Sequence, residues 1–347
     1  MRMPSLPPLY ILLTAAMLAT LVAGLTTFPV IAFLRARKLG QQIRVDGPES
    51  HQEKKDTPTM GGVAILAGLI AGTAFTVLLF APLLPVASRA HALYLLLLLV
   101  LLTIGFTGIG IIDDWSKIHR GRSLGLRARE KLGLQLLLAA GFVAVLLLVL
   151  HQDTTVGVPF IGLLQLGWWY WPLAILFVAG MSNAVNLTDG LDGLAAGTST
   201  VTAGALASIA WLAPTGSLYC GQLVAAFAAC LGGGCLGFLY HNRPTATVFM
   251  GDTGSLAIGA ALAGIALALK LEVIFLLAGL IYLIEIGSVM LQVTYFKFTK
   301  GRRIFLMSPY HHHLEKRGWS ERSIVYRAWV FSLVLAAAAV WLARWTR

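Results

Sequence analysis

Residues 93–117 read LYLLLLLVLLTIGFTGIGIIDDWSK, an apolar run that ends in two adjacent aspartates followed, three residues later, by a lysine. A run of about 20 apolar residues is long enough to cross the hydrocarbon core of a bilayer as a helix. Charged side chains are costly inside that core and gather where a helix leaves it. The stretch therefore predicts a transmembrane helix that delivers a pair of carboxylates to one membrane surface.

The rest of the chain has the same apolar character. Its 347 residues are 58% hydrophobic and 12% charged, with a mean hydropathy of +0.80, which excludes an ordinary soluble domain. The sequence predicts an all-α polytopic membrane protein with ten transmembrane helices, forming one integral membrane domain over residues 1–347. The ten stretches are centred near Leu21, Ala71, Val100, Val143, Phe177, Ala207, Ala229, Gly264, Gly287 and Leu335.

Positive charge is divided unequally between the two sides of the predicted membrane. Five loops share one side: residues 37–58, 113–131, 186–197, 240–253 and 297–325. With the helix ends that feed them, they hold 21 of the 26 Lys and Arg residues. The positive-inside rule makes this side cytoplasmic and puts both termini outside. Contact with anionic lipid explains most of the net charge of +11. Nucleic-acid binding is excluded because the charge is spread over short loops without a recognisable module.

Asp113 and Asp114 are adjacent carboxylates at a membrane helix end, where they repel each other. On a continuing helix Lys117 lies one turn from both, within reach of an ion pair. One interpretation is an acidic helix end that this lysine neutralises. The other, which we favour, is a Mg²⁺ or phosphate site, because hard divalent cations bind carboxylates and substrate phosphates together.

A second polar cluster lies in NAVNLTDGLDG, residues 183–193, where Asn183, Asn186, Asp189 and Asp192 follow at intervals of three. This period predicts that the four side chains share one face as the helix leaves the membrane. The loop lacks Lys and Arg, although most of its neighbours are basic. Binding of a metal ion, or of sugar or nucleoside hydroxyls, is favoured over the alternative of solvated aspartates in glycine-rich turns.

A third cluster contains Asn242, Phe249 and Asp252. Asp252 lies among glycines directly before an apolar stretch, and backbone N–H groups at such a helix start favour an anion. Helix caps use the same residue types, so this motif is weak by itself. Phe249 can stack on a base, although an aromatic residue at the membrane interface is an equally natural interpretation.

Three consecutive histidines, His311, His312 and His313, follow Pro309. On a helix they would point about 100° apart and form no common ligand face, whereas in a loop they can converge. Soft-metal sites use cysteine or spaced histidines, and neither occurs nearby. Contacts to phosphate and sugar oxygens therefore suit these histidines better.

Together with TPTMGG, residues 57–62, these motifs resemble those of the polyprenyl-phosphate N-acetylhexosamine-1-phosphate transferase superfamily. The resemblance covers nearly the whole chain, in motif order and in placement on one side. The run of three histidines followed by Glu315 is similar to the phospho-N-acetylmuramoyl-pentapeptide transferase branch, because the N-acetylglucosamine-1-phosphate branch spaces its histidines differently. Tyr310 departs from this pattern, which has a smaller or aliphatic residue there.

The resemblance implies a Mg²⁺-dependent transferase of peptidoglycan synthesis in the bacterial inner membrane, with a cytoplasmic active site, periplasmic termini and a homodimeric state. Its donor would be UDP-N-acetylmuramoyl-pentapeptide, its acceptor the membrane lipid undecaprenyl phosphate, and its products lipid I and UMP. One rival is a transferase of the same superfamily that uses UDP-N-acetylglucosamine. A remote rival is a transporter, which would hold its acids near the bilayer midplane instead of at helix ends.

The resemblance also implies roles for single residues. Asp252 is the expected principal Mg²⁺ ligand, with Asp113 and Asp114 beside it and Asp113 as candidate base or positioner of the acceptor phosphate. Asp189 is the candidate for a covalent phosphoryl intermediate, the rival to direct transfer. Phe249 is expected to stack on uracil. The expected substrate-binding residues are Lys54, Thr59, Lys117, Asn183, Asn186, Asp192, Asn242, Phe249, His311, His312 and His313.

Glu285 stands apart as an acid inside the apolar segment 281–293. Acids within a membrane span are functional candidates by default. A role in packing between helices explains it equally well, and the sequence leaves both interpretations open.

Overall fold

The computed structural model of the protein describes residues 9–37, 57–119, 125–212 and 218–345. Within these residues, ten helices are long and apolar enough to cross a membrane, and each predicted stretch falls in one of them. The prediction of an all-α polytopic membrane protein is confirmed. The elements are α1 (Leu9–Ala36), α3 (Gly62–Phe80), η1 (Ala81–Leu83), α4 (Val86–His119), α5 (Ala128–Ala144), η2 (Val145–Val149), β1 (Thr155–Val158), β2 (Gly162–Gln165), η3 (Gly167–Trp169), α6 (Tyr170–Thr188), α7 (Leu194–Leu212), α8 (Leu218–Asn242), α9 (Gly251–Leu269), α10 (Glu272–Ala278), α11 (Leu280–Phe298), α12 (Tyr310–Lys316), α13 (Glu321–Leu342) and η4 (Ala343–Trp345).

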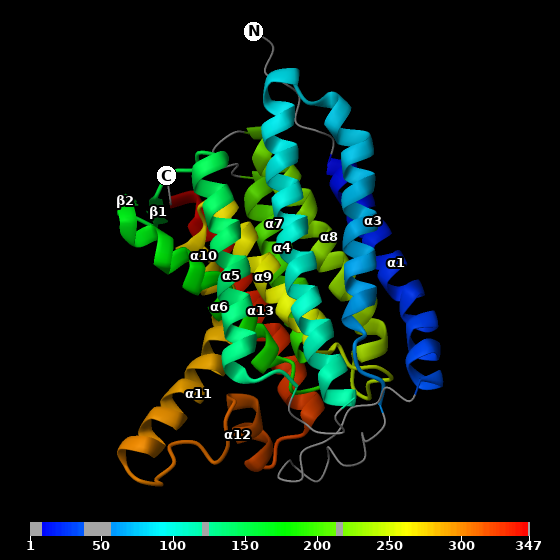
Figure 1. Ribbon diagram of the computed structural model, residues 1–347, viewed down its shortest axis with the longest axis vertical. Coiled ribbons are helices and arrows are strands. Elements are labelled where there is room, and N and C mark those ends of the chain that lie inside the picture. Colours follow the sequence, from blue (N-terminus) through cyan, green and yellow to red (C-terminus); the bar gives the residue numbers. More distant parts are fainter. Residues whose placement is uncertain (1–8, 38–56, 120–124, 213–217, 346–347) are drawn as a thin grey trace.

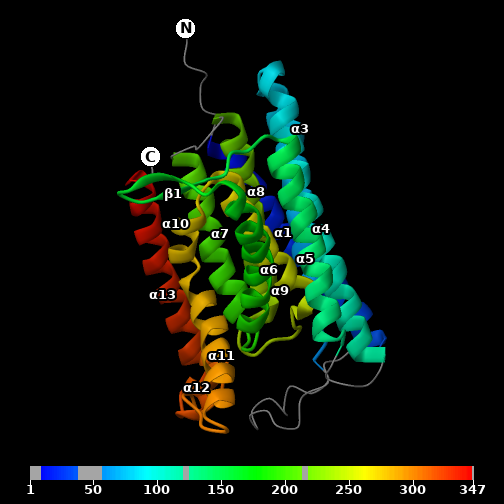
Figure 2. The same ribbon diagram turned by 60° about the vertical axis from the view of Figure 1, so that its left-hand side comes forward.

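The long helices form a bundle around α9, which is almost entirely buried (Figure 1). Helices α4 and α6 pack directly on α9, and α1, α3 and α8 pack together on one flank. On the opposite flank α13 lies against α7 and α10, as the turned view shows (Figure 2). The sequence of α9 is rich in glycine and alanine, and such small residues let membrane helices approach closely.

The polar ends of α4, α5, α6 and α9 lie at one end of the bundle, and α12 lies at the same end beside α11 and α13 (Figures 1 and 2). Helix α4 has 34 residues and is about 51 Å long, whereas the hydrocarbon core of a bilayer is roughly 30 Å thick. It therefore continues beyond that core as a helix. Residues 113–131 are not the simple loop that the sequence indicated, since α4 ends at His119 and α5 begins at Ala128.

Two features away from this end of the bundle were not predicted. The strands β1 and β2 form an antiparallel hairpin in which Val156 is paired with Leu164, and the N–H of Phe160 donates to the carbonyl of Trp345 in η4 at 3.0 Å. The apolar segment that contains the ninth span is also interrupted at Gly279, which separates the short α10 from α11. Helix α11 then leans away from the bundle (Figure 1).

Candidate active site

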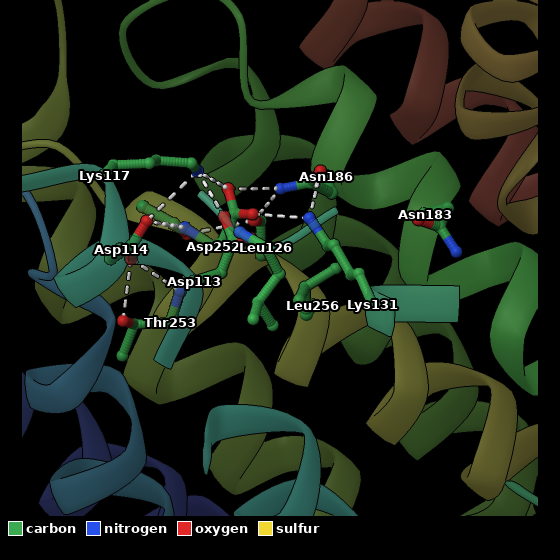
Figure 3. Close-up of polar contacts among 12 residues, drawn as sticks. Asp113, Asp114, Lys117, Leu126, Lys131, Asn183, Asn186, Asp252, Thr253 and Leu256 are labelled. Atoms are coloured by element: carbon green, nitrogen blue, oxygen red, sulfur yellow. Dashed lines mark hydrogen bonds and ion pairs between the residues drawn. The ribbon is translucent and has the colours of Figure 1, made fainter. Parts of the chain in front are cut away.

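Asp113, Asp114 and Asp252 meet where α4 crosses the start of α9. Gly110, one turn before the paired aspartates, makes the crossing close, because a Cβ there would lie 2.2 Å from the carbonyl oxygen of Asp252. One carboxylate oxygen from each aspartate lies within 4.8 Å of the other two, and all three residues are buried. We call these three residues the carboxylate cluster (Figure 3). Its like charges repel one another, so it requires cations.

Asp114 binds the start of α9. Its Oδ1 accepts the N–H of Asp252 at 3.2 Å, and its Oδ2 accepts the N–H and the hydroxyl of Thr253 at 3.0 and 2.8 Å. These N–H groups lie in the first helical turn, where no carbonyl of the same helix accepts them. The anion predicted for this helix start is therefore a carboxylate of the chain itself.

Two lysines neutralise the carboxylate cluster. The Nζ of Lys117 lies 2.7 Å from Asp113 Oδ2 and 2.9 Å from Asp252 Oδ1, which confirms its predicted pairing with the end of α4 (Figure 3). The Nζ of Lys131, from α5, lies 2.5 Å from Asp252 Oδ2. If all five groups are ionised, one net negative charge remains on the site.

Lys131 was missed in the sequence. The signal was its position in the first four residues of α5, where the helix dipole disfavours a cation. Arg129 shares this turn and is exposed, so the position is a weak signal by itself.

The two asparagines of α6 have different partners. Asn186 Nδ2 donates to Asp252 Oδ1 at 3.0 Å and to Ser255 Oγ at 2.9 Å, so this residue directly contacts the carboxylate cluster. Asn183 Nδ2 donates to Gln135 Oε1 of α5 at 2.7 Å, and the side chain lies apart from the aspartates (Figure 3). The amide of Asn183 is thus held in a contact between helices.

Helix α6 ends at Thr188. Asp189 is its C-cap residue, and the N–H of Asp189 still donates to the carbonyl of Val185 at 3.1 Å, whereas Asp192 lies beyond the helix. Asp192 is buried, and its Oδ2 accepts the N–H of Ala246 at 2.9 Å. Burial, and then the charges of Asp252 and of Asp114, raise the pKa of Asp189 well above its usual range. The prediction that all four polar residues share one face of a helix is wrong for Asp192, which lies beyond the end of α6.

Asn242 is buried between two loops. Its amide oxygen accepts the N–H of Gly193 at 3.1 Å, and its amide nitrogen donates to the carbonyl of Val248 at 3.0 Å. These bonds tie the segment after α6 to the segment before α9. The geometry therefore gives Asn242 a role in holding the loops that carry other site residues.

Phe249 and Thr59 lie on adjoining segments at the start of α9. The backbone N–H of Phe249 donates to the carbonyl of Pro58 at 2.8 Å, and its carbonyl accepts the N–H of Gly61 at 2.9 Å. The Phe249 side chain is half-buried and Thr59 is buried. Lys54 lies outside the described residues.

The three histidines lie on the short helix α12, so the loop arrangement in which they would converge is not the one observed. Helical geometry points their rings in different directions. Their Nδ1 atoms contact, in order, Glu285 Oε2 at 3.0 Å, Glu315 Oε2 at 2.6 Å and the N–H of Leu306 at 3.1 Å. Among the three, His311 and His313 are buried.

Comparison with known proteins connects this site to a family. The sequence matches Glycosyl transferase family 4 over residues 94–270, which contain the carboxylate cluster and both lysines. It matches phospho-N-acetylmuramoyl-pentapeptide-transferase signature 1 over residues 54–66.

Bacterial relatives match over nearly their full length. The chain is 44% identical over 338 residues to the phospho-N-acetylmuramoyl-pentapeptide-transferase of Halalkalibacterium halodurans, covering 96% of this chain and 98% of the relative. The proteins of that name from Pelotomaculum thermopropionicum and Bacillus subtilis are 45% and 41% identical, with 96% of this chain covered in each case and 97% and 98% of the relatives. The resemblance of the motifs is confirmed, and the chain belongs to the phospho-N-acetylmuramoyl-pentapeptide-transferase family.

Proposed function

We propose that this protein transfers phospho-N-acetylmuramoyl-pentapeptide from UDP-N-acetylmuramoyl-pentapeptide to undecaprenyl phosphate, forming lipid I and releasing UMP. Family membership supports this reaction. The observation that carries it is the meeting of three carboxylates and two lysines at the ends of membrane helices. A reaction between a water-soluble anionic donor and a lipid acceptor needs charged groups at the membrane surface, where the two substrates can meet. The positive-inside asymmetry of the loops supports a cytoplasmic site in the inner membrane.

The carboxylate cluster suits Mg²⁺. Its donors are all oxygens, which hard divalent cations prefer, and the two lysines leave it with net negative charge when every group is ionised. Asp252 and Asp113 would hold the ion, with Asp114 fixing the start of α9 beside them. Bound Mg²⁺ would supply neutralisation of the diphosphate charge.

Direct transfer is the mechanism that the site supports best. A phosphate oxygen of the acceptor attacks the β-phosphorus of the donor, and the bond from that phosphorus to UMP breaks. Lys117 and Lys131 stabilise the negative charge that develops, which is the main contribution in phosphoryl transfer. Asp113 positions the acceptor phosphate or accepts its proton. A covalent phosphoryl intermediate on Asp189 is the rival mechanism, and a covalent adduct trapped in a single turnover with the donor alone would favour it.

Release of UMP by the purified protein tests this proposal. The protein in detergent is given undecaprenyl phosphate and Mg²⁺ with either UDP-N-acetylmuramoyl-pentapeptide or UDP-N-acetylglucosamine. Turnover of the first donor alone is expected. Turnover of the second donor alone would assign the protein to the other branch, and no turnover of either would return the transporter interpretation.

A further inference from the structure

Glu285 lies in a membrane-spanning helix and is 2% exposed. A single oxygen, Oε2, lies 3.0 Å from Nδ1 of His311 and also accepts the backbone N–H of the same residue at 3.3 Å. An ionised carboxylate offers only acceptors, so in that form Glu285 requires the ring proton of His311 on Nδ1. Glu285 thus restrains both the first turn of α12 and the orientation of its imidazole.

The other ring nitrogen of His311 is left without a partner. Nε2 is buried and makes no hydrogen bond within the described part of the chain. It faces the turn after α6, because a Cβ on Gly190 would lie 2.3 Å from it. Gly190 directly follows Asp189, which lies close enough to Asp252 for the two charges to interact. A buried polar atom without a partner is costly, so its presence against the turn that carries Asp189 and Gly190 points to a ligand.

We infer that Glu285 is a positioning residue that sets the tautomer and orientation of His311, so that Nε2 meets a polar group of the nucleotide-sugar donor beside Gly190. This inference rests on the proposed function and deepens it. Orientation of an imidazole by a carboxylate is a general device at sites where the second ring nitrogen contacts a ligand or substrate. It also explains why the position holds an acid, although burial of a carboxylate in a span is costly.

A double-mutant cycle separates this role from simple packing of α11 on α12. The variants are Glu285→Gln, His311→Gln and the double variant, with Glu272→Gln as a matched control, because Glu272 is a buried glutamate bonded to Tyr170 at the other end of the bundle. Each test variant is expected to lower kcat/KM for the donor by about tenfold to a hundredfold, the range for losing a hydrogen bond to a charged group. The double variant should be no worse than the poorer single variant, and the KM for undecaprenyl phosphate should not change.

A spectroscopic measurement supplies a readout that a packing role would not move. In protein labelled with ¹⁵N-histidine, the Nε2 resonance of His311, assigned by its loss in His311→Gln, should shift when the donor saturates the protein. Glu285→Gln should weaken this shift, whereas Glu272→Gln should preserve it. Gly190→Ala should remove it, because the added methyl group would lie 2.3 Å from Nε2 and displace the ring.

The inference is overturned if losses in the double variant multiply, if both substrates are affected equally together with thermal stability, or if saturating donor leaves the Nε2 resonance unchanged. Failure of the proposed function is a different result, since the wild-type protein would then release no UMP from the muramoyl-pentapeptide donor.

Discussion

Charged groups gather at both ends of this bundle, but the two groups are built differently. At the hairpin end, Lys270 donates to the backbone carbonyls of Asp153 and Thr155, and its Nζ lies 4.1 Å from the centre of the Tyr170 ring. Tyr170 in turn donates to Glu272 at 2.6 Å. We call Asp153, Tyr170, Lys270 and Glu272 the distal network. It joins the β-hairpin to the ends of α6 and α9, and its acids are not brought together.

The carboxylate cluster instead concentrates like charge. Three buried carboxylates share two ammonium groups, and the chain brings them together from three helices. In the distal network, Glu272 instead accepts the hydroxyl of Tyr170, and Asp153 Oδ1 lies 3.3 Å from the Nζ of Lys270. The comparison teaches that acids bonded to a lysine or a tyrosine hydroxyl can serve the fold, whereas three carboxylates within 4.8 Å of one another suit a cation that would relieve their repulsion.

Asp252→Asn should show the difference between the carboxylate cluster and the distal network most clearly. The change removes the charge that both lysines contact, so activity is expected to fall about 10²–10³-fold while the fold is retained. UMP release measures the first effect and thermal unfolding in detergent the second. Asp153→Asn is the matched control and should stay within about twofold of wild-type activity, because its side chain is largely exposed. Near-normal turnover of Asp252→Asn would refute the proposed metal site.

Lys131→Met tests whether the lysine missed in the sequence belongs to the chemistry. Loss of the ion pair to Asp252 is expected to lower kcat/KM about tenfold to a hundredfold, with partial recovery in Lys131→Arg because the charge is retained. Steady-state UMP release with both substrates varied provides the measurement. If Lys131→Met lowers only thermal stability, the residue serves the fold, and the contrast between the two ends weakens.

Lys270→Met should have the opposite effect, lowering stability and leaving activity nearly unchanged. It removes the bonds to two carbonyls and the contact with Tyr170, so the free energy of unfolding is expected to fall by about 1–2 kcal/mol. A lower unfolding temperature with kcat/KM within about twofold of wild type is the expected result. A large loss of activity with unchanged stability would show that the distal network also takes part in the reaction.

Asp189→Asn is expected to have the smallest effect, a change in thermal stability that depends on pH. Because the folded pKa of Asp189 lies above its unfolded value near 3.8, the native state retains a proton that the unfolded state releases, and wild-type stability falls as pH rises through this interval. Asparagine cannot ionise, so the variant should unfold about 2–4 °C higher at neutral pH and match wild type near pH 4. The measurement is the thermal unfolding of both proteins without substrate, from pH 4 to neutral pH. Equal unfolding temperatures at neutral pH would contradict the raised pKa of Asp189.

Several site residues could be predicted because their signal is local. Asp113, Asp114 and Lys117 are neighbours on one helix, so helical spacing alone indicated their contact. Asn183 and Asn186 share that spacing, yet only Asn186 reaches Asp252. The difference lies in α5, which offers Gln135 to one asparagine and Lys131 to the other.

The sequence itself determined the number of spans, the loops that gather positive charge and the family motifs. Hydropathy, charge and residue order can each be read directly along the chain. Only the tertiary structure decided which polar groups meet: Lys131 with Asp252, Asn242 with Gly193, and Glu285 with His311. The physical reason is that contacts between membrane helices depend on close approach at small residues such as Gly110, which sets the depth and rotation of each helix against its neighbour.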